Sequence, residues 1–329
     1  MKRITVIGAG SWGTVLASLL AEKGHEVMLW AFEKEIAAEI NSTGINSVYL
    51  PDTVLSSNLK ATDNIEHAVK GAGCILSVVP AQFTRAIFKK ALGFIPEDAV
   101  IISASKGIEQ KTLLTVSAII REITGRQAAA LSGPSFAKEV IRKLPTAVTL
   151  ATDNPDTGQG LQEIFNTNYF RVYTHTDVLG AELGGALKNV IAIASGISDG
   201  LGLGHDARAA LITRGLAEIV RLGKAMGADP RTFSGLSGLG DLVLTCTGPL
   251  SRNYTVGINL GKGLKLKDIL SAKKSVAEGV ATAQSAYELS KKHNVEMPIV
   301  EQVYEVIYQD KNPGDAVRLL MTRALKAEF

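Results

Sequence analysis

The sequence has few cysteines and almost no excess charge. Its two cysteines, Cys74 and Cys246, stand in neither a CxxC motif nor a Cys/His cluster, so the sequence suggests neither a disulfide framework nor a zinc site. We expect both to be small, buried residues of a protein in a reducing compartment. The net charge of +3, from 35 basic and 32 acidic residues, is too small to indicate nucleic acid or an acidic membrane surface as a partner.

The sequence also lacks a long, uninterrupted apolar run. Lys2 and Arg3 precede an uncharged stretch over residues 4–21 that superficially resembles a signal peptide. Small and polar residues that a secretory segment would not contain interrupt this stretch, at Gly8, Gly10, Ser11, Gly13 and Thr14. The stretch is also too polar to span a bilayer. We therefore expect a cytoplasmic protein without membrane insertion.

The 329 residues suit two domains, and the two parts of the chain carry different patterns. In the first part, short apolar runs rich in β-forming residues alternate with helical patterns or loops: Ile4–Ile7, Val27–Trp30, Cys74–Val79, Val100–Ala104, Ala128–Leu131, Ala147–Ala151 and Phe170–Tyr173. This alternation predicts βαβ units. Because the runs are nearly continuous, we predict a largely parallel sheet covered on both faces, a Rossmann-type doubly wound α/β fold.

After residue 176 the sequence shows no convincing strand pattern. Apolar residues recur at helical spacing in Asp177–Ser195, Arg208–Met226, Ala281–His293 and Ile299–Tyr308, with glycine and proline between these segments. We therefore predict a dinucleotide-binding α/β domain over residues 1–176 and an all-α substrate-binding and catalytic domain over residues 177–329.

A glycine-rich turn follows the first predicted strand. Gly8-Ala9-Gly10-Ser11-Trp12-Gly13 is a GxGxxG motif between a strand and a helical pattern, which is the context that dinucleotide binding requires. Gly8 permits the tight turn, Gly10 lets the backbone approach a pyrophosphate, and Gly13 lets helix and strand pack closely. The start of the helix then offers N–H groups to the anion. The turn predicts NAD or NADP as the cofactor.

The end of the second predicted strand should discriminate between NAD and NADP. A carboxylate at this place binds the ribose 2′-hydroxyl, whereas an arginine accepts a 2′-phosphate. Phe32 and Glu33 stand here, and Glu33 follows Gly13 at about the expected interval of roughly twenty residues. Lys34 could substitute weakly for an arginine. We therefore expect NAD to be modestly favoured over NADP.

Residues 238–253, GLGDLVLTCTGPLSRN, gather several kinds of polar side chain. They bring a carboxylate, two hydroxyls, a guanidinium and an amide, at Asp241, Thr245, Ser251, Arg252 and Asn253. If the middle of this segment is helical, Asp241 and Thr245 share one face. The guanidinium offers a planar fork of donors that suits a phosphate.

A predicted helix carries two adjacent glycines, Gly184 and Gly185, one turn before Lys188. Each costs about 1 kcal/mol against alanine, so the bare face indicates either room for a ligand beside the ammonium or close helix packing. Lys188 could be a base toward an alcohol or, in reverse, an acid toward a developing alkoxide. A nearby Asp241 would hold it charged. Lys106, after the strand at Val100–Ala104, is a candidate second cation at the sheet edge where ligands bind.

Seven motifs in order resemble those of a known family: GAGSWGT near the start, SASKG at 103–107, LSGPSFA at 131–137, ELGGALKN at 182–189, ARAALITRG at 207–215, GLGDLVLTCTGPLSRN at 238–253 and VAEGVATA at 276–283. Over essentially its whole length, the chain resembles the bacterial NAD(P)-dependent sn-glycerol-3-phosphate dehydrogenases. The resemblance implies hydride transfer between a nicotinamide and C2 of glycerol 3-phosphate, which interconverts with dihydroxyacetone phosphate. It also implies a role in phospholipid synthesis and a homodimer.

The resemblance assigns roles to residues at matching positions. Lys188 is the implied proton acceptor, and the implied catalytic group also contains Lys106, Asn189, Asp241 and Thr245. The implied substrate contacts are Lys106, Gly133, Ser135, Lys188, Asp241, Ser251, Arg252 and Asn253, with the phosphate on Arg252 and Asn253. The implied cofactor contacts are Gly8, Gly10, Ser11, Trp12, Gly13, Phe32, Glu33, Lys106, Ala137, Arg252, Val276 and Glu278. We expect no metal.

The chain departs from the family pattern at two places. Phe32 stands where many relatives carry an arginine that grips the NADP phosphate, which argues against a preference for NADP. Gly204-His205-Asp206-Ala207 stands where GDNA is common, and we expect His205 to have a loop or capping role rather than a catalytic one. The alternatives are a dehydrogenase for a related 3-hydroxy acid or sugar acid, and a non-catalytic dinucleotide sensor. A sensor would not need Lys106, Lys188 and Asp241 together.

Overall fold

The structure is a computed structural model that describes residues 2–51, 53–271, 277–325, 327 and 328. Its contacts divide the chain into two compact units. The first unit comprises Met1–Lys106 and Leu114–Glu182, and the second comprises Gly107–Leu113 and Leu183–Phe329. The division therefore falls after residue 182, beside the predicted boundary at 176, and groups a short segment from the first part of the chain with the second unit.

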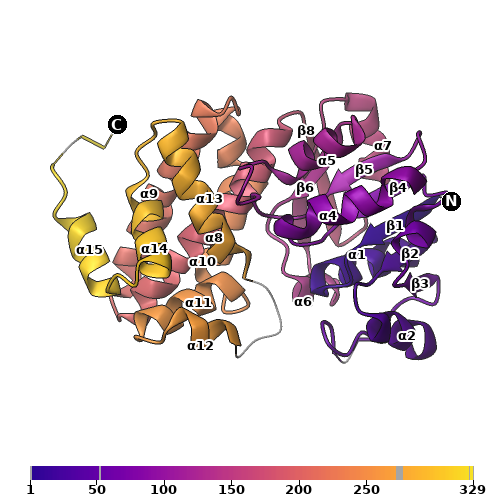
Figure 1. The fold of residues 1–329 in the computed structure, drawn as a ribbon, viewed down its shortest axis with the longest axis horizontal. Helices are drawn as coiled ribbons and strands as arrows, with labels where there is room; N and C mark the ends of the chain where they lie inside the picture. Colours follow the sequence, from indigo (N-terminus) through magenta and orange to yellow (C-terminus); the bar gives the residue numbers. More distant parts are fainter. Residues whose placement is uncertain (1, 52, 272–276, 326, 329) are drawn as a thin grey trace. The chain divides into compact units, whose positions relative to one another are not determined.

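The first unit contains an eight-stranded sheet with the strand order β3-β2-β1-β4-β5-β6-β7-β8 (Figure 1). Its strands are β1 (Arg3–Ile7), β2 (Glu26–Trp30), β3 (Leu59–Thr62), β4 (Cys74–Ser77), β5 (Val100–Ser103), β6 (Ala128–Ser132), β7 (Thr146–Ala151) and β8 (Phe170–His175). All neighbouring strands run parallel except β6 and β7, which are antiparallel. The predicted α/β class and largely parallel sheet are confirmed.

Strand β3 was not among the strands predicted from the sequence. Its four residues, Leu59-Lys60-Ala61-Thr62, include a charged residue and form no continuous apolar run, because β3 is an edge strand that pairs only with β2. The Asn41 side chain binds the outer edge of this strand, donating to the Ala61 carbonyl (2.8 Å) and accepting from the Ala61 N–H (2.9 Å). A side chain thus replaces the pairing that a further strand would give.

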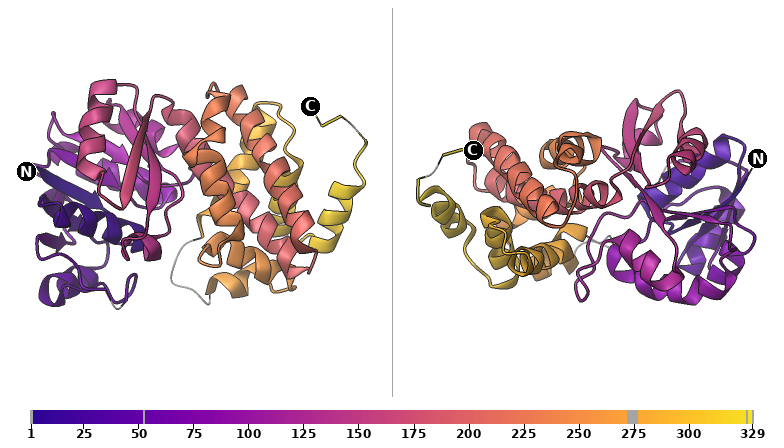
Figure 2. Two further views of the ribbon diagram at one scale, coloured as in Figure 1. Left: turned by 180° about the vertical axis from the view of Figure 1, so that it is seen from behind. Right: turned by 90° about the horizontal axis from the view of Figure 1, so that it is seen from above.

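Helices cover both faces of the sheet (Figure 2). One face packs on α1 (Ser11–Glu22), α2 (Lys34–Thr43), α6 (Ala137–Val140) and α7 (Pro155–Phe165), and the other on α3 (Ile65–Val69), α4 (Ala81–Ala91) and α5 (Val116–Thr124). Each face of the sheet has its own hydrophobic core, and successive strand residues point into alternate cores. In β4, Leu76 lies in the core beneath α1, α2, α6 and α7, whereas Ile75 lies in the core beneath α3, α4 and α5. Two-sided burial explains why the strands read as continuous apolar runs.

The second unit is helical. Its described residues, 107–113, 183–271 and 277–325 with 327 and 328, contain no strand. Helix α8 (Val178–Gly200) begins in the first unit and continues into the second. The elements that follow it are α9 (Gly204–Ala225), η2 (Pro230–Ser234), the π-helical turn η3 (Leu236–Gly240), α10 (Asp241–Thr247), α11 (Arg252–Gly261), α12 (Leu266–Ser271), α13 (Glu278–Lys292), α14 (Pro298–Tyr308) and α15 (Pro313–Met321). The four predicted helices are confirmed with shifted ends. Helix α8 is long and apolar enough to cross a membrane, but 89% of its apolar window is buried inside the protein.

Helices α8 and α11 approach each other at glycine positions. A Cβ added to Gly196 would lie 2.1 Å from the Tyr254 carbonyl oxygen, and one added to Gly257 would lie 2.1 Å from the Ile193 carbonyl oxygen. Any side chain at these two positions would therefore force the helices apart. The contact fixes the start of α11, where Arg252 and Asn253 stand, relative to α8.

A buried carboxylate joins α9 to the start of α14. Glu218 is 1% exposed and accepts the backbone N–H groups of Ile299 (2.7 Å) and Val300 (3.1 Å). These are donors that a helix leaves without intrahelical partners. Burial nevertheless raises the pKa of Glu218 from 4.5 to about 7, because loss of solvation outweighs the two hydrogen bonds.

We predict that Glu218 lowers the stability of the protein as the pH rises from about 4.5 to about 7. Within this window the folded protein keeps a proton that the unfolded chain has released, so the free energy of unfolding should fall by up to about 3 kcal/mol. Glu218→Gln should lack this fall in the free energy of unfolding, whereas Glu97→Gln, at an exposed position, should retain it. Urea unfolding below, within and above the window measures the effect. Equal pH dependence in the parent and Glu218→Gln would contradict the prediction.

Candidate active site

The glycine turn joins β1 to α1 with the geometry that a dinucleotide requires. Gly8 has a φ of +116°, which L side chains rarely adopt, and a Cβ on Gly13 would lie 1.9 Å from the Gly8 carbonyl oxygen. Both positions therefore need glycine. By contrast, a Cβ on Gly10 would meet no atom within 4 Å. The strand order reverses beside β1, which is where ligands bind in this class of sheet.

The start of α1 suits an anion. Gly10 is the N-cap residue, no side chain caps the helix, and its first turn holds no acidic residue. The N–H groups and the positive end of the helix dipole are thus left for a pyrophosphate. The Trp12 side chain is partly buried and packs on the core beside Phe170, with ring centroids 6.3 Å apart.

Glu33 and Phe32 follow β2, as expected. Glu33 is the N-cap residue of α2, and its carboxylate accepts a hydrogen bond from the Tyr49 hydroxyl (2.9 Å). Phe32 is 79% exposed and lies edge-on to Trp30. Tyr49 was not predicted from the sequence, because it belongs to none of the motifs named above and reaches Glu33 only through the tertiary structure.

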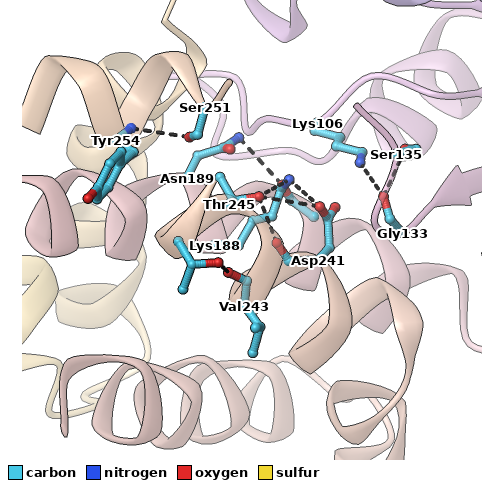
Figure 3. Close-up of polar contacts among 12 residues, drawn as sticks. Lys106, Gly133, Ser135, Lys188, Asn189, Asp241, Val243, Thr245, Ser251 and Tyr254 are labelled. Atoms are coloured by element: carbon cyan, nitrogen blue, oxygen red, sulfur yellow. Dashed lines mark hydrogen bonds and ion pairs between the residues drawn. The ribbon is translucent and has the colours of Figure 1, made fainter. Parts of the chain in front are cut away.

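A second group of polar residues in the first unit lies after β5 and β6. The Lys106 ammonium and the Ser135 hydroxyl both donate to the Gly133 carbonyl oxygen, each at 2.9 Å (Figure 3). Because β5 and β6 are parallel neighbours, their carboxyl ends bring these residues together. Ala137, two residues after Ser135, begins α6.

In the second unit, Lys188 forms a buried cluster with Asp241 and Thr245 (Figure 3). Its ammonium lies 2.5 Å from the Asp241 carboxylate and 2.8 Å from the Thr245 hydroxyl. The Thr245 hydroxyl donates to the Asp241 carbonyl oxygen (2.6 Å), so it faces the ammonium as an acceptor. Lys188 is 6% exposed and Asp241 1%. The carboxylate stabilises the charged form of the lysine.

The glycine beside this cluster serves protein packing. A Cβ on Gly184 would lie 2.5 Å from the Ser237 carbonyl oxygen, so the bare face of α8 accepts the backbone of η3. The interpretation of Gly184 as room for a ligand is therefore wrong, and close packing is confirmed at this position. Turn η3 leads directly into Asp241 at the start of α10. The missing side chain thus lets Asp241 approach Lys188.

The start of α11 presents the other polar residues of the 238–253 segment. Ser251 caps the helix, accepting from the Tyr254 N–H (3.2 Å), and Arg252 is exposed at the first helical position. The side-chain oxygen of Asn253, Oδ1, accepts the Gly279 N–H (3.0 Å) at the start of α13. This contact orients the Asn253 amide, because its oxygen is engaged by α13 and its NH₂ group must point elsewhere.

Other candidate residues are placed as follows. Asn189 is buried on α8, and its amide donates to the Gly185 carbonyl oxygen at 3.5 Å. Glu278 is the first residue of α13, whereas Val276 lies outside the described residues. His205 is in the first turn of α9 and contacts Arg208, which pairs with Asp199 (2.7 Å).

The two cysteines are buried, as predicted, at 1% and 0% exposure. Burial raises the pKa of Cys246, which lies on α10, and of Cys74 to about 12. Both thiols are therefore neutral near pH 7, and neither is suited to nucleophilic chemistry.

Comparisons with known proteins cover almost the whole chain. Residues 3–158 match the family described as NAD-dependent glycerol-3-phosphate dehydrogenase N-terminus, and residues 177–318 match its C-terminus. The chain is 58% identical over 331 aligned positions to the glycerol-3-phosphate dehydrogenase [NAD(P)+] of Geobacter sp. (strain M21), covering 99% of each chain. The corresponding protein of Citrifermentans bemidjiense is 57% identical, again over 99% of each chain. A crystal structure of glycerol-3-phosphate dehydrogenase from Coxiella burnetii superposes with a TM-score of 0.95 at 40% identity, covering 98% of this chain and 99% of that one.

We predict that two substitutions in the glycine turn will affect different properties, one the stability of the protein and the other its affinity for the dinucleotide. Gly13→Ala should lower the melting temperature, at a cost of about 1–3 kcal/mol or more, because its methyl group overlaps the Gly8 carbonyl oxygen. Gly10→Ala should leave the melting temperature unchanged but weaken dinucleotide binding about tenfold or more, because its methyl group occupies the space that a pyrophosphate approaches. Thermal unfolding and fluorescence titration with NADH measure the two effects. Parent-like affinity in Gly10→Ala would contradict this view of the turn.

Proposed function

The chain belongs to the NAD-dependent glycerol-3-phosphate dehydrogenase family, and from this premise we propose that it reduces dihydroxyacetone phosphate to sn-glycerol 3-phosphate. The observation that carries the proposal is the buried Lys188–Asp241–Thr245 cluster, in the same helical unit as Arg252 and Asn253. A proton donor for a carbonyl oxygen and a guanidinium for a phosphate are the two groups that this reaction needs from the protein.

We assign the proton transfer to Lys188. Reduction of the C2 carbonyl creates a developing alkoxide, which must be stabilised and protonated. The Asp241 carboxylate keeps Lys188 in the ammonium form that can give this proton, and Thr245 holds the ammonium in place. In the oxidation direction Lys188 must first lose its proton before it can accept one from the alcohol. Asn189 and Lys106 complete the proposed catalytic group.

We assign the substrate phosphate to the start of α11. Arg252 offers the guanidinium, and Asn253 offers an amide whose oxygen is held by the Gly279 N–H, so its donor side remains for an acceptor. Ser251, Gly133 and Ser135 are the further proposed substrate contacts. The positive end of the ten-residue helix α11 adds to the attraction for an anion.

The cofactor is NAD or NADP, and when bound it supplies the hydride. The turn at Gly8–Gly13 fits its pyrophosphate, and Ser11, Trp12, Phe32 and Glu33 are the further proposed contacts in the first unit, with Lys106 and Ala137. Arg252, Val276 and Glu278 are those of the second unit. No metal is proposed.

We further propose that the protein is a cytoplasmic homodimer, partnered by neither nucleic acid nor membrane, that feeds glycerophospholipid synthesis. The proposed product, sn-glycerol 3-phosphate, is the backbone of these lipids. Burial of the apolar helix α8 supports the absence of membrane insertion. The chain matches both the N-terminal and the C-terminal part of the glycerol-3-phosphate dehydrogenase family, which disfavours a sensor or a dehydrogenase for an unphosphorylated hydroxy acid.

The direct test of the reaction is the absorbance of the reduced nicotinamide. Purified protein with dihydroxyacetone phosphate should oxidise the cofactor, and Lys188→Met should reduce turnover by about 100-fold or more while leaving cofactor affinity unchanged. Loss of one partner of a buried ion pair can cost about 3–5 kcal/mol of stability, so Lys188→Met/Asp241→Asn, which removes both charges, provides the folded control. Activity in this double variant at the parent level would refute the role of Lys188.

We predict that Arg252→Ala will raise KM for dihydroxyacetone phosphate with little effect on kcat. A charge-assisted hydrogen bond contributes about 1.5–3 kcal/mol, which corresponds to about 10- to 150-fold in KM. Arg318→Ala on α15, also an exposed arginine, should leave KM unchanged. Initial rates at saturating cofactor measure the effect. An unchanged KM in Arg252→Ala would place the phosphate elsewhere.

A further inference from the structure

We propose that Tyr49 is a specificity-determining residue that, by holding the Glu33 carboxylate, makes this protein selective for NADH over NADPH. The inference deepens the proposed function, because it concerns the cofactor of the same reaction. It rests on a chain of hydrogen bonds within the first unit that runs from the glycine turn to the end of β2.

The first link fastens the loop after α2 to the glycine turn. The Asn46 side chain is fully buried, and its NH₂ group donates to the Ala9 carbonyl oxygen and to the Thr14 hydroxyl, each at 2.9 Å. The side-chain oxygen of Asn46, Oδ1, accepts the Tyr49 N–H (3.2 Å). One amide thus ties the backbone of Tyr49 to the turn that fits the pyrophosphate.

The second link joins the turn to the carboxylate through Tyr49 itself. The Ser11 hydroxyl donates to the Tyr49 carbonyl oxygen (2.7 Å), and the Tyr49 hydroxyl donates to Glu33 Oε1 (2.9 Å). Glu33 in turn lies three residues after Trp30, the last residue of β2, in the region that meets the adenosine ribose in this class of fold. A single residue therefore connects the places where the pyrophosphate and this ribose bind.

The tether matters because an untethered glutamate discriminates poorly. A glutamate side chain on the surface can rotate away from a 2′-phosphate and so avoid much of the repulsion. A carboxylate held by a phenol keeps its place, where it accepts from a ribose 2′-hydroxyl and repels a 2′-phosphate. The exposed Lys34 and the N-terminal end of α2 attract a phosphate. The carboxylate that Tyr49 holds in place opposes this attraction.

The test is the dissociation constant of NADH and of NADPH, each measured by fluorescence titration without substrate. We expect the parent to bind NADH about 100-fold more tightly than NADPH, as a fixed like charge costs several kcal/mol. Glu33→Gln should bring the ratio close to unity, mainly through tighter NADPH binding. Tyr49→Phe should lower the ratio about tenfold in the parent, yet change nothing further in a Glu33→Gln background, because Tyr49 acts through the carboxylate.

Tyr173→Phe, an exposed tyrosine on β8, is the matched control and should leave the ratio unchanged. Binding of NADPH as tight as that of NADH by the parent would overturn the proposal. Equal effects of Tyr49→Phe in the parent and in Glu33→Gln would also overturn it, since Tyr49 would then act only on the loop. These titrations do not depend on the proposed reaction. If dihydroxyacetone phosphate is not reduced, the proposed reaction is wrong, but the ratio of the two dissociation constants still tests the role of Tyr49.

Discussion

The ion pair between Lys188 and Asp241 is the interaction around which the second unit is arranged. Two charges this deeply buried are tolerated only when they meet at short range and other groups satisfy their remaining capacity. Three features bring them together: Gly184 lets η3 approach α8, η3 leads directly into Asp241, and Thr245 lies one turn further along α10. The site chemistry is thus inseparable from the packing of α8, η3 and α10.

In the first unit the corresponding constraint is the close approach of helix α1 to the backbone of the turn after β1. Glycine is required where α1 meets the turn and where the backbone bends, but at Gly10 the space is open. The surrounding loop is then bound to the turn by the buried Asn46. Both units therefore use glycine to bring backbones together and buried polar side chains to fix functional groups.

Features that depend on local pattern could be predicted from the sequence. The strands buried on both faces read as apolar runs, and the GxGxxG motif stood between a strand and a helix, so both were found. The missed strand β3 is a short edge strand whose pairing is partly replaced by Asn41. Gly184 was ambiguous, because a bare helix face looks the same whether a ligand or a backbone fills it. Tyr49 was not found, because its contact with Glu33 joins an irregular loop to the end of β2 through tertiary structure alone.

We propose that Asp241 keeps Lys188 protonated, so that Lys188 acts as an acid in the reduction. The most direct measurement is the pH dependence of kcat in both directions, for the parent and for a folded Asp241→Asn variant. If so, reduction of dihydroxyacetone phosphate should fall toward alkaline pH while oxidation of glycerol 3-phosphate should rise, and Asp241→Asn should move both profiles to lower pH. Profiles that run parallel in the two directions, or that Asp241→Asn leaves in place, would contradict it.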